Sequence, residues 1–191
     1  DNRVVGNAIG LAATESTVVG NGGCGVKVVS GPRDTLIGEG PDPGNQVAGS
    51  GQDGVAVLQA VGTVVVGAAI HGSGRHGVNL EDASGGLVIW NAIYGNEGDG
   101  VRASGTAARA NAVYMSSIHA NSGKGIALAN GAHDGIQAPI ISFASSAVAT
   151  GVACPGCRVQ VFSDAEDEGR EWQGVVDADP ATGEWTLETA L

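Results

Sequence analysis

The sequence has few aromatic residues, few charges and no long hydrophobic run. Aromatic residues make up 4% of the 191 residues, which excludes a globular core built around Phe and Trp. No run of about 18 apolar residues occurs, so the sequence offers no membrane span. Lys27 and Lys124 are its two lysines, and the net charge is −11. This balance excludes nucleic acids and anionic membranes as partners, because neutralising phosphates requires clustered Lys and Arg.

Glycine and small aliphatic residues take the place of the missing types. The 33 glycines follow no strict period of three, which excludes collagen, and Val, Ile, Leu and Ala recur too regularly for a disordered chain. The chain begins at Asp1 with no signal-like stretch, so we expect a processed product or a part of a longer precursor. The acidic surface is typical of a soluble extracellular protein and could attract cations.

A repeated motif, Gly followed by Val or Ile, predicts a stack of similar turns of chain. The spacings between its five copies are 29, 23, 23 and 25 residues. The copies begin at the anchor glycines, Gly25, Gly54, Gly77, Gly100 and Gly125. We expect these glycines to supply a backbone conformation that other residues adopt only at a cost.

Positions counted from the anchor glycines form columns of like residues. Apolar residues stand one position after the anchor, at Val26, Val55, Val78, Val101 and Ile126, and seven before it, at Val18, Val47, Ile70, Ile93 and Ile118. The last three repeats add Val65, Val88 and Val113, twelve positions before the anchor. Alternating apolar and other residues are typical of strands, so each repeat should hold about three. A polar column at Asn21, Ser50, Ser73, Asn96 and Asn121 predicts a ladder at a tight corner.

These columns predict an all-β solenoid whose coils stack about 4.8 Å apart. A leucine-rich solenoid lacks its Leu-rich signature here, and a β-propeller needs repeats of about 40 residues or more. The stretches that carry a family resemblance are GNAIGLAATESTVVGNGGCGVKV and DTLIGEGPDPGNQVAGSGQDGVAV. They resemble the secreted bacterial right-handed parallel β-helix repeat proteins of the pectate-lyase-like superfold. The resemblance covers residues 1–134, with Asp34 where that family usually has Asn.

The resemblance implies a right-handed parallel β-helix and leaves the activity open. The same coil is used by lyases, epimerases, adhesins and passive stalks. Residues 135–191 lack the repeat pattern. They contain a segment of alternating apolar and polar residues at 158–162 and further strand-like segments at 173–176 and 184–187. They resemble the small antiparallel Ig-like β-sandwich modules attached to such β-helices, where a further strand or two normally follows. We therefore expect an incomplete module, either cut from a longer precursor or completed by a strand from another subunit.

The column directly before the anchor glycines carries the ionisable candidates. It contains Cys24, Asp53, His76, Asp99 and Lys124, and we call it the ionic column. Coil stacking would place Asp53, His76 and Asp99 on successive layers, where they could bind a divalent cation such as calcium or perform acid–base catalysis on a polysaccharide. Arg75 and Arg102 are the nearest basic candidates for proton abstraction. The alternative is a solvated face of complementary charges.

A second outward column contains His71, Tyr94 and His119, and we call it the aromatic column. It could stack on a sugar ring, or form an ordinary surface strip. Cys154 and Cys157 have CxxC spacing without a following helix signal or a second pair, which disfavours redox and zinc sites. The resemblance and the local strand pattern favour a disulfide that closes a tight loop. Cys24 is expected to be free, with an intermolecular bridge as the alternative.

Three functional hypotheses follow from these features. The first is a non-catalytic structural or adhesive protein outside the cell or on its surface, with end-to-end stacking into a filament or surface layer as a sharper version. The second is a lyase or epimerase acting on an acidic polysaccharide. The third is a carbohydrate- or cation-binding module without turnover. We expect no resident cofactor, and the first hypothesis is favoured because ionisable residues are sparse.

Overall fold

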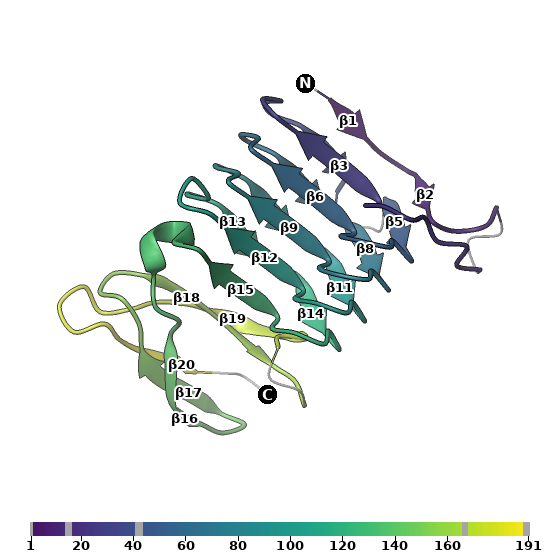
Figure 1. Ribbon diagram of the computed structural model, residues 1–191. Helices are drawn as coiled ribbons and strands as arrows, with labels where there is room; N and C mark the ends of the chain where they lie inside the picture. The colour runs from purple at the N-terminus through teal and green to yellow at the C-terminus, as the bar shows by residue number, and fades with distance from the viewer. Residues whose placement is uncertain (1, 14–16, 41–43, 166–167, 189–191) are drawn as a thin grey trace.

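A parallel β-helix forms the larger part of the molecule (Figure 1). The computed structural model describes residues 2–13, 17–40, 44–165 and 168–188. Strands β1 to β15 coil so that every third strand pairs in parallel with its equivalent in the next coil, which builds three five-stranded sheets. The prediction of three short strands per repeat is confirmed, and each coil's backbone finds its partners in the neighbouring coils.

Sheet 1 contains β1 (Arg3–Val4), β4 (Leu36–Gly38), β7 (Val64–Val66), β10 (Leu87–Ile89) and β13 (Ala112–Tyr114). Sheet 2 contains β2 (Ala8–Ile9), β5 (Asn45–Ala48), β8 (Ala68–His71), β11 (Ala92–Tyr94) and β14 (Ser117–His119). Sheet 3 contains β3 (Val26–Val29), β6 (Val55–Leu58), β9 (Val78–Glu81), β12 (Val101–Ser104) and β15 (Ile126–Ala129).

The strand register follows the predicted columns in sheet 3. Val55 pairs with Val26 on one side and Val78 on the other, and the same register continues through Val101 to Ile126. The first four of these side chains are buried in one continuous core. Ile126 is 49% exposed because it lies on the last coil, where no further coil covers its face. Stacked aliphatic columns therefore replace the aromatic core that the composition excludes.

The first coil departs from the predicted column. Ile9, not Val18, pairs with Val47 in sheet 2. Val18 lies in a segment that follows β2 and forms an antiparallel bridge with Leu11, and its side chain is 51% exposed. The assignment of Val18 to the inner column is wrong, because a segment inserted between the second strand and the corner shifts the numbering. Asn21 rejoins the register by pairing with Ser50.

The anchor glycines are needed for space and not for a special backbone conformation. None of the five has a positive φ. A Cβ at Gly77 would overlap Ile93 Cγ2 in the next coil and lie 2.7 Å from the Gly100 carbonyl oxygen. The expected reason for these glycines is therefore wrong. The left-handed conformation occurs instead at the corners, as at Gly72 (φ 64°) and Trp90 (φ 56°).

Two small antiparallel sheets follow the last coil. The chain passes through the 3₁₀ helix η1 (Ala132–Gly135) into this C-terminal module. One sheet has the order β16–β17–β20, from strands Ile140–Ala144, Val148–Val152 and Glu184–Glu188, and the other pairs β18 (Arg158–Ser163) with β19 (Glu171–Asp177). Their shared core is made of Ala149, Val159, Val161, Ala178 and Trp185.

The β18–β19 hairpin covers the end of sheets 1 and 2 and lies where a further coil would lie. The Gln160 side-chain amide donates to the Val113 carbonyl (2.7 Å) and accepts from the Met115 amide (3.2 Å). Beside it, the Ile118 amide donates to the Gly169 carbonyl (3.0 Å). The Asn121 amide donates to Glu168 Oε2 (2.9 Å). The module therefore satisfies backbone groups that an additional coil would otherwise bond.

No helix in the described ranges is long and apolar enough to cross a membrane.

Candidate functional site

The ionic column lies at the corner that leads into sheet 3, one residue before each anchor glycine. Successive pairing of β6, β9 and β12 places Asp53, His76 and Asp99 on neighbouring coils, as the register predicts. Each of the three side chains accepts a hydrogen bond from the main chain of the next coil. Asp53 Oδ1 accepts from the His76 amide (3.2 Å), and His76 Nδ1 accepts from the Asp99 amide (2.9 Å). Asp99 Oδ1 accepts from the Lys124 amide (3.0 Å).

Asp53 is the most enclosed member of the column, at 2% exposure. Its second oxygen accepts a hydrogen bond from Asn79 Nδ2 (3.1 Å) and lies 3.7 Å from an Arg75 guanidinium nitrogen. Asn79 extends outward from β9 but is itself buried, and its Oδ1 has no hydrogen-bond partner among the described residues. The Asp53 carboxylate is therefore held by a main-chain amide, a side-chain amide and a partly exposed guanidinium.

Two observations bear on the charge of His76, and they point in opposite directions. Its Nδ1 lies 3.4 Å from Asp99 Oδ2, which would suit an ion pair with a protonated ring. The same nitrogen accepts the Asp99 amide at 2.9 Å, which requires Nδ1 to carry no proton. Burial lowers the pKa of His76, against the opposing effect of Asp99 and Asp53. The hydrogen bond has the better geometry, so we assign the neutral ring.

Arg102 completes the cluster by donating from a guanidinium nitrogen to Asp99 Oδ2 (3.2 Å). Arg75 and Arg102 each face a carboxylate of the ionic column, so the structure brings together all five sequence candidates for acid–base chemistry. The carboxylates and Nδ1 are occupied by coil-to-coil bonds, which leaves Nδ1 unsuited to accept a substrate proton. No group of three or more His, Cys, Asp or Glu side chains within the described ranges is arranged to hold a metal ion.

The aromatic column lies on the outer face of sheet 2, at the ends of β8, β11 and β14. His71 pairs with Tyr94, and Tyr94 with His119. The His71 and Tyr94 rings are 4.8 Å apart and 9° from parallel, and the Tyr94 and His119 rings are 5.3 Å apart and 3° from parallel. The rings cover each other's faces, so the column presents ring edges to solvent. A sugar could stack only on the outer faces of His71 and His119. Burial lowers the pKa of His71.

Two buried asparagines that lie outside the predicted columns, Asn45 and Asn91, join the coils. Asn91 Nδ2 donates to the Val65 carbonyl (3.0 Å), and its Oδ1 accepts from the Ala68 amide (3.0 Å). Asn45 makes the equivalent bonds to Val4 and Asn7. Both stand nine residues before an anchor glycine, so the repeat register contained the signal. In the polar corner column, Asn96 and Asn121 bond to the adjacent coil.

The three cysteines occupy two separate places. Cys154 and Cys157 are joined by a disulfide in the turn after β17, and the Cys157 amide donates to the Cys154 carbonyl. Cys24 is a free thiol of intermediate exposure, 3.7 Å from Gln52 Oε1. The structure therefore has a short covalent loop in the module and a lone thiol near the first coils.

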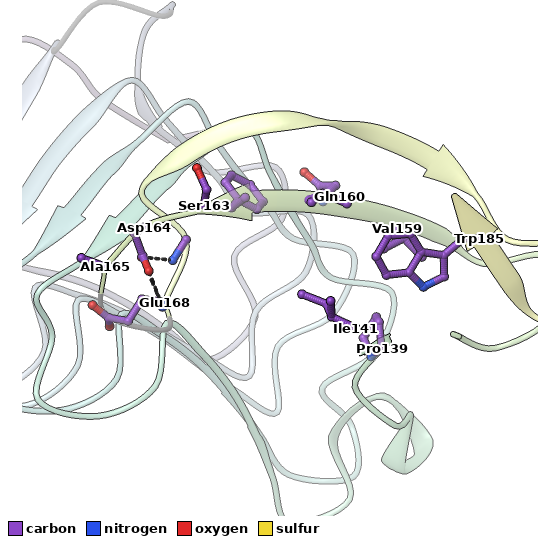
Figure 2. Close-up of a pocket in the computed structure, with 12 residues that line it drawn as sticks. Pro139, Ile141, Val159, Gln160, Ser163, Asp164, Ala165, Glu168 and Trp185 are labelled. Carbon is purple, nitrogen blue, oxygen red and sulfur yellow. Dashed lines mark hydrogen bonds between the residues drawn. The ribbon is translucent and has the colours of Figure 1, made fainter. Parts of the chain in front are cut away.

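The cavities we describe lie beside the C-terminal module, away from Asp53, His76, Asp99 and the aromatic column. Two cavities of about 490 Å³ each lie beside β18. Figure 2 shows one of them, with Asp164 of the β18–β19 loop accepting bonds from the amides of Glu168 and Gly169. These hollows belong to the C-terminal module and its junction with the last coil, and Lys124, the last member of the ionic column, lines the second of them.

Residues 4–143 match the family model described as a right-handed β-helix region. The chain belongs to the right-handed β-helix family. The match covers all fifteen strands of the coil except the first residue of β1, and continues into β16. A search of curated proteins found no significant match to this chain.

Membership of the right-handed β-helix family supplies the handedness of the coil and confirms the expected architecture. It is consistent with a structural role or with a role involving polysaccharide, because the fold hosts both. The choice between these roles rests on the chemistry of the columns.

Proposed function

We propose that this chain is a non-catalytic structural and adhesive part of a protein that acts outside the cell or on its surface. The observation that carries the proposal is the bonding of the ionic column. Asp53, His76 and Asp99 each accept a main-chain amide of the next coil. Their primary contribution is to hold the coils together.

The disulfide and the charge support a location outside the cytosol. A disulfide between Cys154 and Cys157 persists where the environment is oxidising. The net charge of −11 keeps the protein soluble, as suits a protein outside the cell. Fractionation of the native source should recover the protein from the medium or the cell surface; recovery from the cytosol alone would refute this location.

The end-to-end filament is the less favoured version of the structural role. The β18–β19 hairpin occupies the amides of Met115, Ile118 and Asn121 at the end of the coil. A second molecule could extend sheets 1 and 2 there only after the module had moved away. Electron microscopy of the purified protein should therefore show short, uniform particles at all concentrations.

The test of the non-catalytic proposal is incubation with a panel of pectins, alginates and glycosaminoglycans, with and without calcium. A lyase releases unsaturated uronates, which absorb in the ultraviolet, and an epimerase changes the uronate signals in the proton NMR spectrum. We expect neither product. Turnover that is lost in a His76→Asn variant, which keeps an acceptor for the Asp99 amide, would overturn the proposal.

Carbohydrate binding without turnover is a second candidate, supported by the aromatic column. Stacked rings hold a phenol and imidazole edges at fixed spacing along sheet 2. If this column binds glycans, Tyr94→Phe should weaken binding on a glycan array, because the stack remains and the hydroxyl is lost. Tyr114→Phe, which removes a hydroxyl from sheet 1, is the matched control. Equal binding by both variants would exclude the column as the site.

A further inference from the structure

The outer edge of β18 is flanked by two hollows. Among the described strands, β18 pairs with β19 alone, so its other edge has no strand partner. The two cavities of about 490 Å³ share Val159, Gln160 and Phe162 of this strand, and both are also lined by Pro139. In Figure 2, Pro139 and Ile141 lie across this hollow from β18, on the side away from β19. Both hollows thus lie against the strand that has the free edge.

The first hollow opens into the core of the C-terminal module. It is lined by Ile141, Val161 and Trp185, among others. Trp185 is 4% exposed, and its indole Nε1 is buried with no hydrogen-bond partner among the described residues. A buried N–H without an acceptor costs about 1–3 kcal/mol. One of the side chains that line the hollow therefore carries a buried polar group with no acceptor among the described residues, beside apolar side chains.

The second hollow opens onto the end of the β-helix. It is lined by Val113, Ile118 and Ile126, the inward-facing side chains of the last coil. Ile126 is 49% exposed and Leu128, next inward on β15, is 42% exposed. The hairpin covers sheets 1 and 2 but leaves this part of sheet 3 open. An apolar side chain placed here would continue the aliphatic columns of the coil.

A β-strand is the kind of ligand that fits both hollows at once. Its side chains alternate between opposite faces at about 3.3 Å per residue, while its main chain bonds to the neighbouring edge. We propose that the free edge of β18 binds a β-strand supplied by a different protein chain. Alternate apolar side chains of that strand enter the module core and the end of the coil, and a carbonyl or side-chain oxygen accepts the Trp185 indole N–H.

The charged residues in the second hollow indicate which charge the partner strand should carry. The charged residues that line the hollow at the end of the coil are Lys124, Arg158 and Glu168, and the Glu168 carboxylate accepts the Asn121 amide (2.9 Å). Arg158 is paired with Asp177 (2.9 Å), whereas the Lys124 ammonium makes no ion pair within the described residues. The partner strand should therefore carry an acidic residue beside Lys124. A second copy of this chain is disfavoured, because two molecules of charge −11 repel each other.

The probe is a set of synthetic six-residue peptides, which match β18 in length. In each peptide valine alternates with threonine, and one terminal residue, first or last, is glutamate or lysine. The scrambled controls have the same composition, but their valines are adjacent. The indole N–H signal of Trp185 in the ¹⁵N NMR spectrum of the full chain is the readout, with Trp90 as internal reference. We expect a saturable shift of Trp185 while Trp90 stays unchanged, and tighter binding of the glutamate-ended peptides.

Two variants test the contacts by titration calorimetry. Trp185→Phe keeps most of the ring and removes the N–H, and should weaken the alternating peptide about fivefold, the loss of one hydrogen bond. Lys124→Glu should reverse the preference between glutamate-ended and lysine-ended peptides, and Lys27→Glu, at β3 near the other end of the coil, should leave it unchanged.

Three results would overturn the proposal. The first is an unshifted Trp185 signal with every peptide. The second is equal affinity for alternating and scrambled peptides. The third is a Trp185 shift that appears on raising the protein concentration without peptide, because this would make a second copy of the chain the occupant. The proposal holds or fails independently of whether the coils are structural or catalytic.

Discussion

Asn91 shows at the residue scale how one buried amide joins two coils. It is 2% exposed, donates to the Val65 carbonyl and accepts from the Ala68 amide. Asn91→Ala leaves both main-chain groups without a partner in the interior, so the free energy of unfolding should fall by about 2–4 kcal/mol. Urea denaturation measures this change. Asn2→Ala, at an exposed position, is the matched control and should change stability by less than about 0.5 kcal/mol.

His76 makes the stability of the fold depend on pH. Burial lowers its pKa from the ordinary 6.5, and Arg102 and Arg75 add to that effect against Asp99 and Asp53. The unfolded chain therefore binds a proton at a pH where the folded chain does not. The stabilising contribution of the neutral ring is complete above about pH 6.5, and it is lost as the pH falls from there through the lower folded pKa.

The corresponding prediction compares urea denaturation at about pH 7.5 and about pH 5. Wild-type stability should fall on acidification. His76→Asn supplies an amide oxygen in place of Nδ1 and has no charge to titrate, so the fall should become smaller. Some pH dependence will remain, because burial also lowers the pKa of His71. An unchanged pH dependence in the variant would show that His76 does not contribute.

The turn into sheet 3 illustrates the element scale, because its anchor glycine has no room for a side chain. At Gly77, a Cβ would meet Ile93 Cγ2, the Gly100 oxygen and Asn96 Nδ2. Gly77→Ala should therefore lower the free energy of unfolding by about 1–3 kcal/mol, as overpacking does elsewhere. Gly23→Ala is the control, since its Cβ would meet no atom within 4 Å and its φ is not positive. Comparable losses in both variants would indicate a general backbone effect and contradict the packing argument.

The repeat register could be predicted because every coil must bond to the next. One correct alignment at the anchor glycines therefore places His71 beside Tyr94 and Asp53 beside His76. Val18 was assigned to the inner column because it stands seven residues before an anchor glycine. The inserted segment gives it that spacing, although Ile9 occupies the inner position. The reason for Gly77 could not be inferred, since it depends on atoms of the next coil.

At the scale of the whole molecule, the C-terminal module is the feature that the repeat pattern could not place. The alternating segment at 158–162 predicted β18, and the strand-like segments at 173–176 and 184–187 predicted β19 and β20. The position of Glu168 against Asn121 carried no sequence signal, because Glu168 lies outside the repeat and reaches the last coil through tertiary contacts. The contact between the module and the last coil could therefore be found only in the structure.

The docking of the module on the last coil gives the final prediction. Gln160 and Glu168 supply the acceptors and donors that a further coil would provide for Val113, Met115 and Asn121. A combined Gln160→Ala and Glu168→Ala variant should leave the earlier coils folded, because their strands pair with one another. It should free the amides of Met115 and Asn121 to exchange with solvent.

Hydrogen exchange followed by NMR distinguishes this local effect from general destabilisation. Loss of a hydrogen bond of about 1 kcal/mol at each site should speed exchange at Met115 and Asn121 about fivefold, while the amide of Val78 in the middle of the coil keeps its protection. Glu184→Ala, an exposed substitution on β20, should alter neither. Faster exchange at Val78 as well would mean that the module stabilises the entire solenoid. Unchanged exchange at Asn121 would mean that Glu168 does not hold the last coil in solution.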